Sequence, residues 1–123
     1  MLTQDWMMRQ IETMTLSIAK LIFQKDTTEY TMTQREESPA LSEADDLYVA
    51  MLSLTESGRF DHAENMLFDC LDTGNSAFLD VANDFYARLN ALSDQELTEG
   101  NFSRQEIQDG LEDVMEQFNV VLP

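Results

Sequence analysis

The chain has 123 residues, of which 43% are apolar, so a single folded domain is expected and a wholly disordered chain is excluded. Seven Lys and Arg stand against 24 Asp and Glu, which gives a net charge of −17 at pH 7. A surface this acidic repels nucleic acid and anionic lipid, so we exclude direct binding to either. Any partner is expected to be a protein or peptide, with basic partners favoured.

The acidic charge is concentrated after residue 38. Residues 1–38 hold six acids and four bases, whereas residues 39–123 hold 18 acids and three bases. No stretch approaches the roughly 18–20 apolar residues that a membrane-spanning helix needs, and the start of the chain does not resemble a signal peptide. The single cysteine excludes an intramolecular disulfide. Together these features favour a cytoplasmic location.

Residues 1–24 are predicted to form a long N-terminal amphipathic helix, covering 2–24. Its apolar residues recur at helical spacing: Met7, Ile11, Met14, Ile18, Leu21 and Ile22, with Trp6 beside them. Two interpretations stay open. In the first, this stripe packs as core against the rest of the chain. In the second, it pairs with a partner helix or forms a homodimer, through Trp6, Met7, Ile11, Met14 and Ile18.

Residues 25–41 interrupt the helical pattern and are predicted to be a polar linker. The segment is rich in threonine and contains Pro39 near its end. Tyr30 and Met32 alternate with threonines, as in a strand, but a lone strand has no partner to pair with. We therefore expect this segment to be mobile.

Residues 42–73 are predicted to form a helical hairpin. Ser42, with Asp45 three residues later, matches the capping pattern at the start of a helix. Gly58 is the expected left-handed stop of the first helix, and Asp61 starts the second helix as Ser42 starts the first. The apolar faces of the two helices comprise Leu47, Ala50, Met51 and Leu54, then Ala63, Leu67, Cys70 and Leu71.

The spacing of these positions is similar to that of a tetratricopeptide repeat. The resemblance rests on Leu47, Ala50, Met51, Leu54, Gly58, Phe60, Ala63 and Leu67. It implies that Gly58 turns the corner, that Phe60 plugs the hairpin and that Ala63 lets the helices approach closely. The chain departs from the repeat at Leu47, where an aromatic is usual, at Met51, where glycine is usual, and in lacking the closing proline.

The chain as a whole also resembles a small family of uncharacterised bacterial proteins. The likeness includes its start, Met-Leu-Thr-Gln-Asp-Trp-Met-Met-Arg-Gln-Ile-Glu. This resemblance implies a helical fold and brings no known activity with it.

Residues 76–119 are predicted to form a second hairpin, which completes a repeat-like domain over 42–123. Asn75 or Ser76 caps its first helix, Ser93 with Glu96 predicts a short helical turn over 94–98, and the last helix covers about 104–119. The apolar face of the first of these helices comprises Phe78, Ala82, Phe85, Leu89 and Leu92.

The second hairpin contains an echo of the first corner. Residues 58–64, Gly-Arg-Phe-Asp-His-Ala-Glu, are matched by residues 100–106, Gly-Asn-Phe-Ser-Arg-Gln-Glu. The echo favours two similar hairpins stacked side by side, although Gln105 stands where the first unit has Ala63. Chance, or the shared demands of helix starts, is the alternative. Gly110 interrupts the last helix, and either close helix packing or chance on an exposed face explains it.

The sequence carries no recognisable catalytic, metal or cofactor site. His62 and Cys70 are the only residues of their types. Eight positions along one helix separate them by about 12 Å, which is too far for a nucleophile–base pair. We expect Cys70 to be a buried, inert thiol and His62 to be solvated. The stretch from Asp94 resembles a calcium loop but has Glu99 where that loop needs glycine. We therefore predict no enzymatic activity, no metal and no cofactor.

The predicted fold is all-α, with antiparallel, tetratricopeptide-repeat-like helical hairpins and a long N-terminal helix. We predict a cytoplasmic protein–protein interaction module that presents a groove between the hairpins to a protein or peptide, with basic partners favoured. The predicted groove residues are Tyr48, Met51, Phe85 and Tyr86. Two alternatives stay open. One is a structural protein that self-associates through residues 2–24, and the other is an acidic mimic of nucleic acid that occupies a DNA-binding protein.

Overall fold

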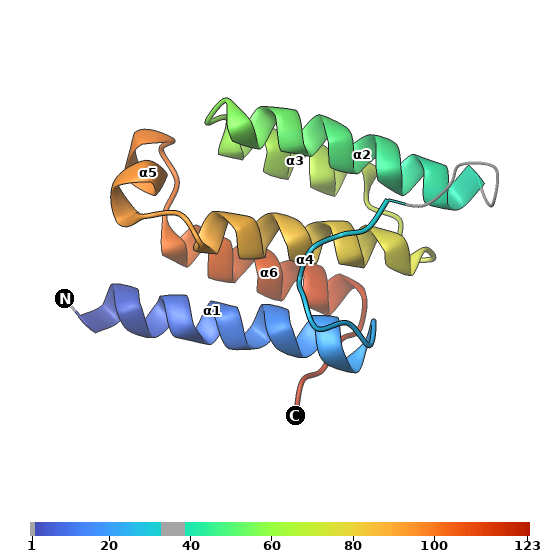
Figure 1. The fold of residues 1–123 in the computed structure, drawn as a ribbon, viewed down its shortest axis with the longest axis horizontal. Helices are drawn as coiled ribbons and strands as arrows, with labels where there is room; N and C mark the ends of the chain where they lie inside the picture. The colour runs from blue at the N-terminus through green and yellow to red at the C-terminus, as the bar shows by residue number, and fades with distance from the viewer. Residues whose placement is uncertain (1, 33–38) are drawn as a thin grey trace.

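The computed structural model describes residues 2–32 and 39–123, and these residues form helices and no strands. The all-α prediction is therefore confirmed for the described part of the chain. The helices are α1 (Leu2–Leu21), α2 (Pro39–Glu56), α3 (Phe60–Cys70), α4 (Ser76–Asn90), α5 (Asp94–Glu99) and α6 (Arg104–Gln117) (Figure 1). One cluster of buried side chains draws on all of these helices.

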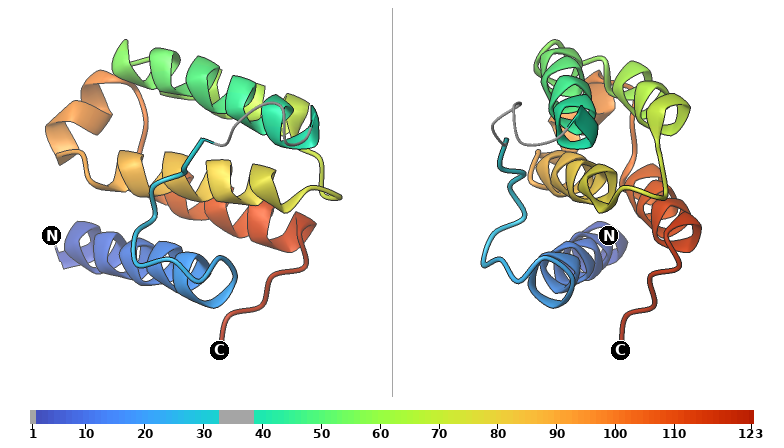
Figure 2. Two further views of the ribbon diagram at one scale, coloured as in Figure 1. Left: turned by 45° about the vertical axis from the view of Figure 1, so that its right-hand side comes forward. Right: turned by 90° about the vertical axis from the view of Figure 1, so that its right-hand side faces the viewer.

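The five longer helices lie roughly parallel or antiparallel to one another, at three levels (Figure 1, Figure 2). α2 and α3 lie side by side at one end of the stack, α4 and α6 occupy the middle, and α1 lies at the opposite end. α2 and α4 run in one direction, whereas α1, α3 and α6 run the other way. Because α4 contacts α1, α2 and α6, it is the helix around which the others pack.

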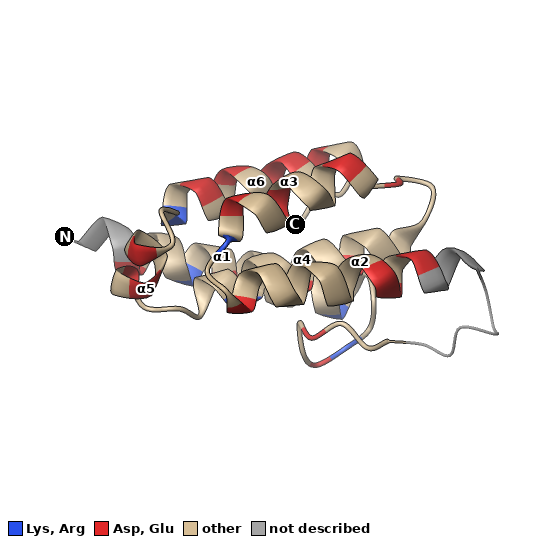
Figure 3. Cartoon of the chain, turned by 90° about the horizontal axis from the view of Figure 1, so that it is seen from above, with Lys and Arg blue, Asp and Glu red and all other residues tan. Residues whose placement is uncertain are grey.

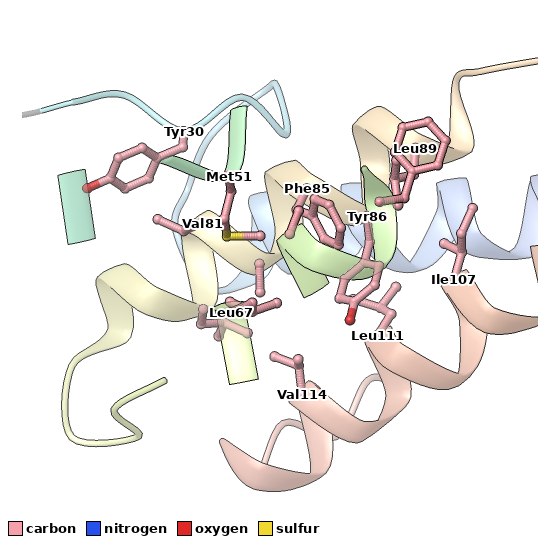
Figure 4. Close-up of a cluster of buried hydrophobic side chains, with 14 of the residues drawn as sticks. Tyr30, Met51, Leu67, Val81, Phe85, Tyr86, Leu89, Ile107, Leu111 and Val114 are labelled. Atoms are coloured by element: carbon pink, nitrogen blue, oxygen red, sulfur yellow. The ribbon is translucent and has the colours of Figure 1, made fainter. Parts of the chain in front are cut away.

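Burial on several sides distinguishes α4 from the other helices. Ten of its fifteen residues are buried, and they include the polar residues Asn83, Asp84 and Asn90. Its apolar side chains meet those of α2, α3 and α6 in the core, where Figure 4 shows the Tyr86 ring directed toward Leu111 of α6. Since burial removes polar groups from water, the polar residues of α4 need partners from neighbouring elements.

Two asparagines of α4 bind α1. The side-chain amide of Asn83 donates to the carbonyl oxygen of Thr15 at 3.0 Å, and that of Asn90 donates to the carbonyl oxygen of Met8 at 2.9 Å. The two accepting residues of α1 are as far apart in the sequence as the two asparagines of α4, and the pairs follow opposite chain directions. α1 therefore runs antiparallel to α4 in one fixed register. The stripe of α1 therefore packs against the rest of the protein.

Arg104, the first residue of α6, is buried and joins the ends of α4, α5 and α6. Its guanidinium donates to the carbonyl oxygens of Asn90 at 2.7 Å and Leu92 at 2.6 Å, and it forms an ion pair with Asp94 at 3.1 Å. The last carbonyls of a helix have no partners within the helix. The Arg104 side chain therefore donates hydrogen bonds to carbonyl oxygens at the end of α4 and fixes the start of α6 beside them.

α1 ends at Leu21, earlier than the predicted residue 24. Gln24 adopts a left-handed backbone conformation, with φ of 55°. The N–H of Lys25 donates back to the carbonyl oxygen of Ala19 at 2.9 Å, which is a common way to close a helix. The Lys25 ammonium then forms an ion pair with Asp80 of α4 at 2.9 Å, so the chain leaves α1 already bound to α4.

Tyr30 anchors the segment that follows. Its N–H donates to Asp84 at 2.8 Å, and its hydroxyl donates to Asp45 at 2.6 Å, so it connects α4 with α2. The Tyr30 side chain is buried. Over residues 25–32, the expected polar linker is thus held to α4 through Lys25 and Tyr30, and its mobility stays a prediction. Residues 33–38 of the predicted linker lie outside the described part of the chain.

The structure corrects the predicted starts of two helices. α2 begins at Pro39, whose fixed backbone angle suits a first helical position, so Ser42 is not its cap. α3 begins at Phe60, and Arg59 is the capping residue without a side-chain hydrogen bond, so Asp61 lies inside the first turn.

The later helix starts follow the sequence pattern. The side chain of Asn75 accepts from the N–H of Ala77 at 3.0 Å and caps α4, as predicted. Ser93 and Ser103 each accept from a backbone N–H three residues on, and the glutamate at that position accepts from the N–H of the serine. These capping boxes need only neighbouring residues, so sequence spacing is sufficient to find them.

The two Gly-x-Phe corners of the sequence echo contact each other, but their glycines are needed for different reasons. Gly58 has a left-handed backbone with φ of 80°, which glycine adopts most readily. Gly100 has φ of −87°, and the left-handed residue at that corner is Asn101. A Cβ on Gly100 would collide with the Phe60 ring, which packs edge-on against Phe102 with centroids 6.2 Å apart. The second glycine therefore permits contact between the corners.

Replacement of Gly100 by alanine is expected to lower the free energy of unfolding by about 1–3 kcal/mol, the usual cost of an overpacked core. The new methyl group meets the buried Phe60 ring. Urea denaturation of the wild type, Gly100→Ala, Phe60→Leu and the double variant measures this effect. Because Phe60→Leu removes the ring, the double variant should lose less than the sum of the single losses, and additive losses would contradict the contact.

Candidate binding groove

A groove runs between α2 and α4 and continues to the corner at α5. Its narrow part lies between Tyr48 of α2 and Arg88 of α4. Its wide part, with a volume of about 450 Å³, is bounded by the end of α2, the Gly58 corner, Leu92 and α5. Thr55 and Arg88 line both parts. We therefore treat the two parts as one surface, named here the α2–α4 groove.

Arg88 stands at the centre of the α2–α4 groove. Its Nε and Nη2 atoms donate to the two carboxylate oxygens of Asp84 at 3.1 and 3.3 Å, and Nη2 also donates to the Tyr48 hydroxyl at 3.2 Å. Burial acts to lower the pKa of Arg88, but the contacts with Asp84 outweigh burial and raise it. Burial and the charge of Asp84 raise the pKa of Tyr48. The centre is therefore a neutralised ion pair beside a protonated phenol.

Negative charge borders the wide end of the groove. Its three glutamates, all exposed, are Glu56, Glu96 and Glu99. Hydrogen bonds from the backbone and side chain of Ser93 lower the pKa of Glu96, which keeps it ionised at neutral pH. The half-buried Leu92 provides apolar surface beside these carboxylates, and Phe60, only 4% exposed, forms the base within the core. The wide end thus combines an apolar floor with an acidic rim.

The predicted groove residues lie in different places. Tyr48 is half-buried in the groove wall. Met51 and Phe85 also border the groove, but they are only 2% and 4% exposed, so they form its base within the core. Tyr86 is fully buried and faces Leu111 of α6 (Figure 4). Placing Tyr86 in the groove is wrong, because consecutive positions of a helix face different neighbours. A binding role for the other three residues stays a prediction.

Tyr86 instead joins α3, α4 and α6. Its hydroxyl donates to Glu64 of α3 at 2.7 Å. A Cβ on Gly110 of α6 would collide with both groups, so close packing explains this glycine. Burial raises the pKa of Tyr86, and the charge of Glu64 adds to the effect. Burial also raises the pKa of Glu64, which the Tyr86 hydrogen bond offsets only in part while nearby carboxylates raise it further.

The residues predicted for self-association lie mostly inside the protein. Met7, Ile11 and Ile18 are buried, and Met14 is partly buried against the core. Trp6, by contrast, keeps 62% of its surface exposed. The face of α1 that carries the four buried or partly buried residues packs on α4 and α6. These four residues, which exclude Trp6, are therefore part of the core and are not available to a second helix.

His62 and Cys70 are both exposed on α3. The prediction of a buried Cys70 is wrong, because this last residue of the helix lies at the edge of an open hollow, one turn beyond the buried Leu67. Across residues 2–32 and 39–123, no three His, Cys, Asp or Glu side chains gather closely enough to hold a metal ion. None of the helices described above is both long and apolar enough to cross a membrane.

Sequence reasoning missed Arg88 and the acidic rim. Arg88 follows Asp84 by four residues, a spacing that predicts an ion pair on a helix, so a local signal was present. Glu56 belongs to α2, whereas Glu96 and Glu99 belong to α5. Since these helices are far apart in the sequence, no local pattern brings the three carboxylates together.

Among known protein families, one described as a family of unknown function (DUF6483) matches residues 1–119. No curated protein and no solved structure matches the chain. The match covers all six helices and both sides of the α2–α4 groove.

The free energy of unfolding is expected to fall as the pH rises from about 4 to about 7, and Glu64 contributes to this fall. Its pKa is raised in the folded protein, above an unfolded value of about 4.3. The stabilisation that comes from protonation of Glu64 is therefore fully present below the unfolded pKa and is lost as the pH rises through the folded pKa. Glu64→Gln keeps an acceptor for Tyr86 and removes this titration, so its stability should change less with pH.

Urea denaturation at about pH 4.5 and about pH 7 measures the difference. Glu112→Gln removes one charge from an exposed position of α6 and serves as the matched control. If the stability of Glu64→Gln changes between the two pH values as much as that of the wild type, Glu64 is not a source of the pH dependence.

Proposed function

The chain belongs to the DUF6483 family, whose function is unknown, and we propose that it is a protein–protein interaction module without catalytic activity. The observation that carries this proposal is the α2–α4 groove, an open apolar floor beside an acidic rim. Such a surface suits a segment of another protein. The proposal includes a cytoplasmic location, supported by the exposed thiol of Cys70, the single cysteine of the chain.

The proposed partner segment is apolar on one side and carries Lys or Arg. Its apolar side chains would cover Leu92, and its basic side chains would approach Glu56 and Glu99. Because Asp84 neutralises Arg88, the centre of the groove does not repel such a segment. The wider surface adds attraction at longer range, since Figure 3 shows Asp and Glu spread along α3 and α6 with few cations among them.

We also propose that α2–α3 and α4–α6 are tetratricopeptide-repeat-like units. Two observations support this: α2 and α4 run in the same direction, and so do α3 and α6 (Figure 1). Phe60 and Ala63 are buried, and Gly58 has the left-handed backbone that the corner needs. α5 is then an addition to the second corner, and it supplies the acidic wall of the groove. Neighbouring repeats commonly bind partners on the surface between them.

Reversal of the charge on the acidic rim should abolish partner capture. The test variant is Glu56→Lys/Glu99→Lys, and Glu112→Lys/Glu116→Lys makes the same charge change on exposed positions of α6. Tagged proteins are used for affinity capture from a lysate of the source organism at about 50 mM and about 200 mM salt. The wild type and the α6 variant should retain the same partner, more strongly at the lower salt, and the rim variant should lose it.

Equal capture by the rim variant and the α6 variant would contradict the groove as the binding surface. Glu96 is left unchanged in this design because its carboxylate is part of the capping box with Ser93. Both variants can therefore be compared with the wild type at similar stability, which urea denaturation verifies.

A further inference from the structure

The outward face of α1 carries a second stripe that the core does not use. The exposed residues along it are Trp6, Arg9, Thr13, Leu16 and Lys20. They follow one another at steps of three and four residues, so they share one face of the helix. Trp6 and Leu16 are 62% and 46% exposed, which is high for large apolar side chains. We name this set the α1 outer stripe.

Within residues 2–32 and 39–123, the α1 outer stripe also holds most of the side-chain positive charge that is not engaged in an ion pair. Lys25, Arg88 and Arg104 are each engaged in an ion pair with a carboxylate. Of the remaining cations in the described part of the chain, Arg9 and Lys20 lie on the stripe and Arg59 lies at the start of α3. In a protein with a net charge of −17, this stripe therefore presents a basic and apolar surface to solvent, although α1 also carries the exposed acids Asp5 and Glu12 beside it.

A matching surface lies on α2 and α3. It is an open hollow of about 500 Å³, and its lining includes Glu43, Asp46, Ala50, Met66, Cys70 and Phe78. The walls are largely apolar, and the two carboxylates belong to the exposed side of α2. We name it the α2–α3 hollow. It differs from the α2–α4 groove in all of these residues.

The stripe and the hollow of one molecule cannot meet. α1 lies at one end of the stack of helices, and α2 and α3 lie at the other, in each of the three views (Figure 1, Figure 2). Contact between these two surfaces therefore requires two copies of the chain. The charges are complementary in that arrangement, since the basic Arg9 approaches the exposed carboxylate of Glu43.

We propose that the α1 outer stripe of one copy docks in the α2–α3 hollow of a second copy. The Trp6 ring enters the hollow, which has room for it, and Arg9 on the next turn pairs with Glu43 of α2. Leu16, ten residues from Trp6, contacts the surface about 15 Å further along. This interface is heterologous, so each copy keeps one unused stripe or hollow to which another copy can add. The inference does not depend on the α2–α4 groove.

The chain offers a direct readout, because it contains one tryptophan and one cysteine, and these lie on the two proposed surfaces. Sedimentation velocity of the full chain, from about 10 µM to about 1 mM, measures association. Over the same concentrations, Trp6 emission should shift to shorter wavelength and the reaction of Cys70 with a thiol reagent should slow. All three changes should reverse between about 50 mM and about 300 mM salt.

Two results of that experiment would overturn the proposal. One is a monomer at every concentration. The other is association with a shifted Trp6 emission and an unchanged Cys70 reaction rate, which would indicate contact between two α1 helices.

Charge reversal on the stripe tests the same interface without disturbing the core. Arg9→Glu should weaken association by about tenfold or more, as expected for a charged contact at low salt. Arg59→Glu makes the same charge change at an exposed position away from both surfaces and should associate like the wild type. Equal weakening by the two variants would show a general effect of net charge and would overturn the proposed contact.

A mixing experiment separates this arrangement from a symmetric dimer. One variant, Trp6→Ala/Arg9→Glu, lacks a working stripe, and the other, Ala50→Glu, lacks a working hollow. Each alone should be monomeric, and an equimolar mixture should form a dimer and nothing larger, since only one interface can form. A hollow variant that still associates alone, with its fold verified by urea denaturation, would overturn the proposal.

Discussion

The buried polar groups of α4 are the constraint on which the rest of the structure depends. A helix covered on several sides favours neighbours that supply matching groups to its amides and carboxylates, since an unpaired one costs about 1–3 kcal/mol. Asn90 donates to Met8 of α1 and accepts from Arg104. Asn83 donates to Thr15 of α1, while its side-chain oxygen is buried without a hydrogen-bond partner among the described residues. Asp84 binds Tyr30 and Arg88. Each pairing fixes the position of a different element around the same helix.

The character of the α2–α4 groove follows from this constraint. Asp84 accepts one hydrogen bond from the backbone N–H of Tyr30 and another from Arg88. The same carboxylate therefore holds the segment that follows α1 against α4 and neutralises the positive charge at the centre of the groove. The charge of the groove then depends on its ends, where α5 contributes Glu96 and Glu99. α5 is held there because Arg104 joins the end of α4 to the start of α6. The position of the acidic rim therefore follows from the hydrogen bonds that neighbouring elements make to the polar groups of α4.

Features that depend on neighbouring residues could be predicted from the sequence, and features that depend on distant ones could not. The caps at Ser93 and Ser103 and the stop at Gly58 are local, and the structure contains all three. Tyr30 lies in a polar, threonine-rich stretch, and nothing near it in the sequence indicates that α2 and α4 both bind it. Helical periodicity likewise places Tyr86 at the edge of an apolar face without showing which neighbouring helix the side chain meets.

The contacts of α1 bear on the order in which the protein is made. The hydrogen bond between Asn83 and Thr15 spans 68 residues, and that between Asn90 and Met8 spans 82. At about 5–20 residues per second, a ribosome takes roughly 3–14 s to add the shorter of these spans. Throughout that interval the inner face of α1 has no core to join, while α2 and α3 are complete earlier and can pair with each other. Among the helices of this stack, α1 is thus the one that most needs shielding until α4 has emerged.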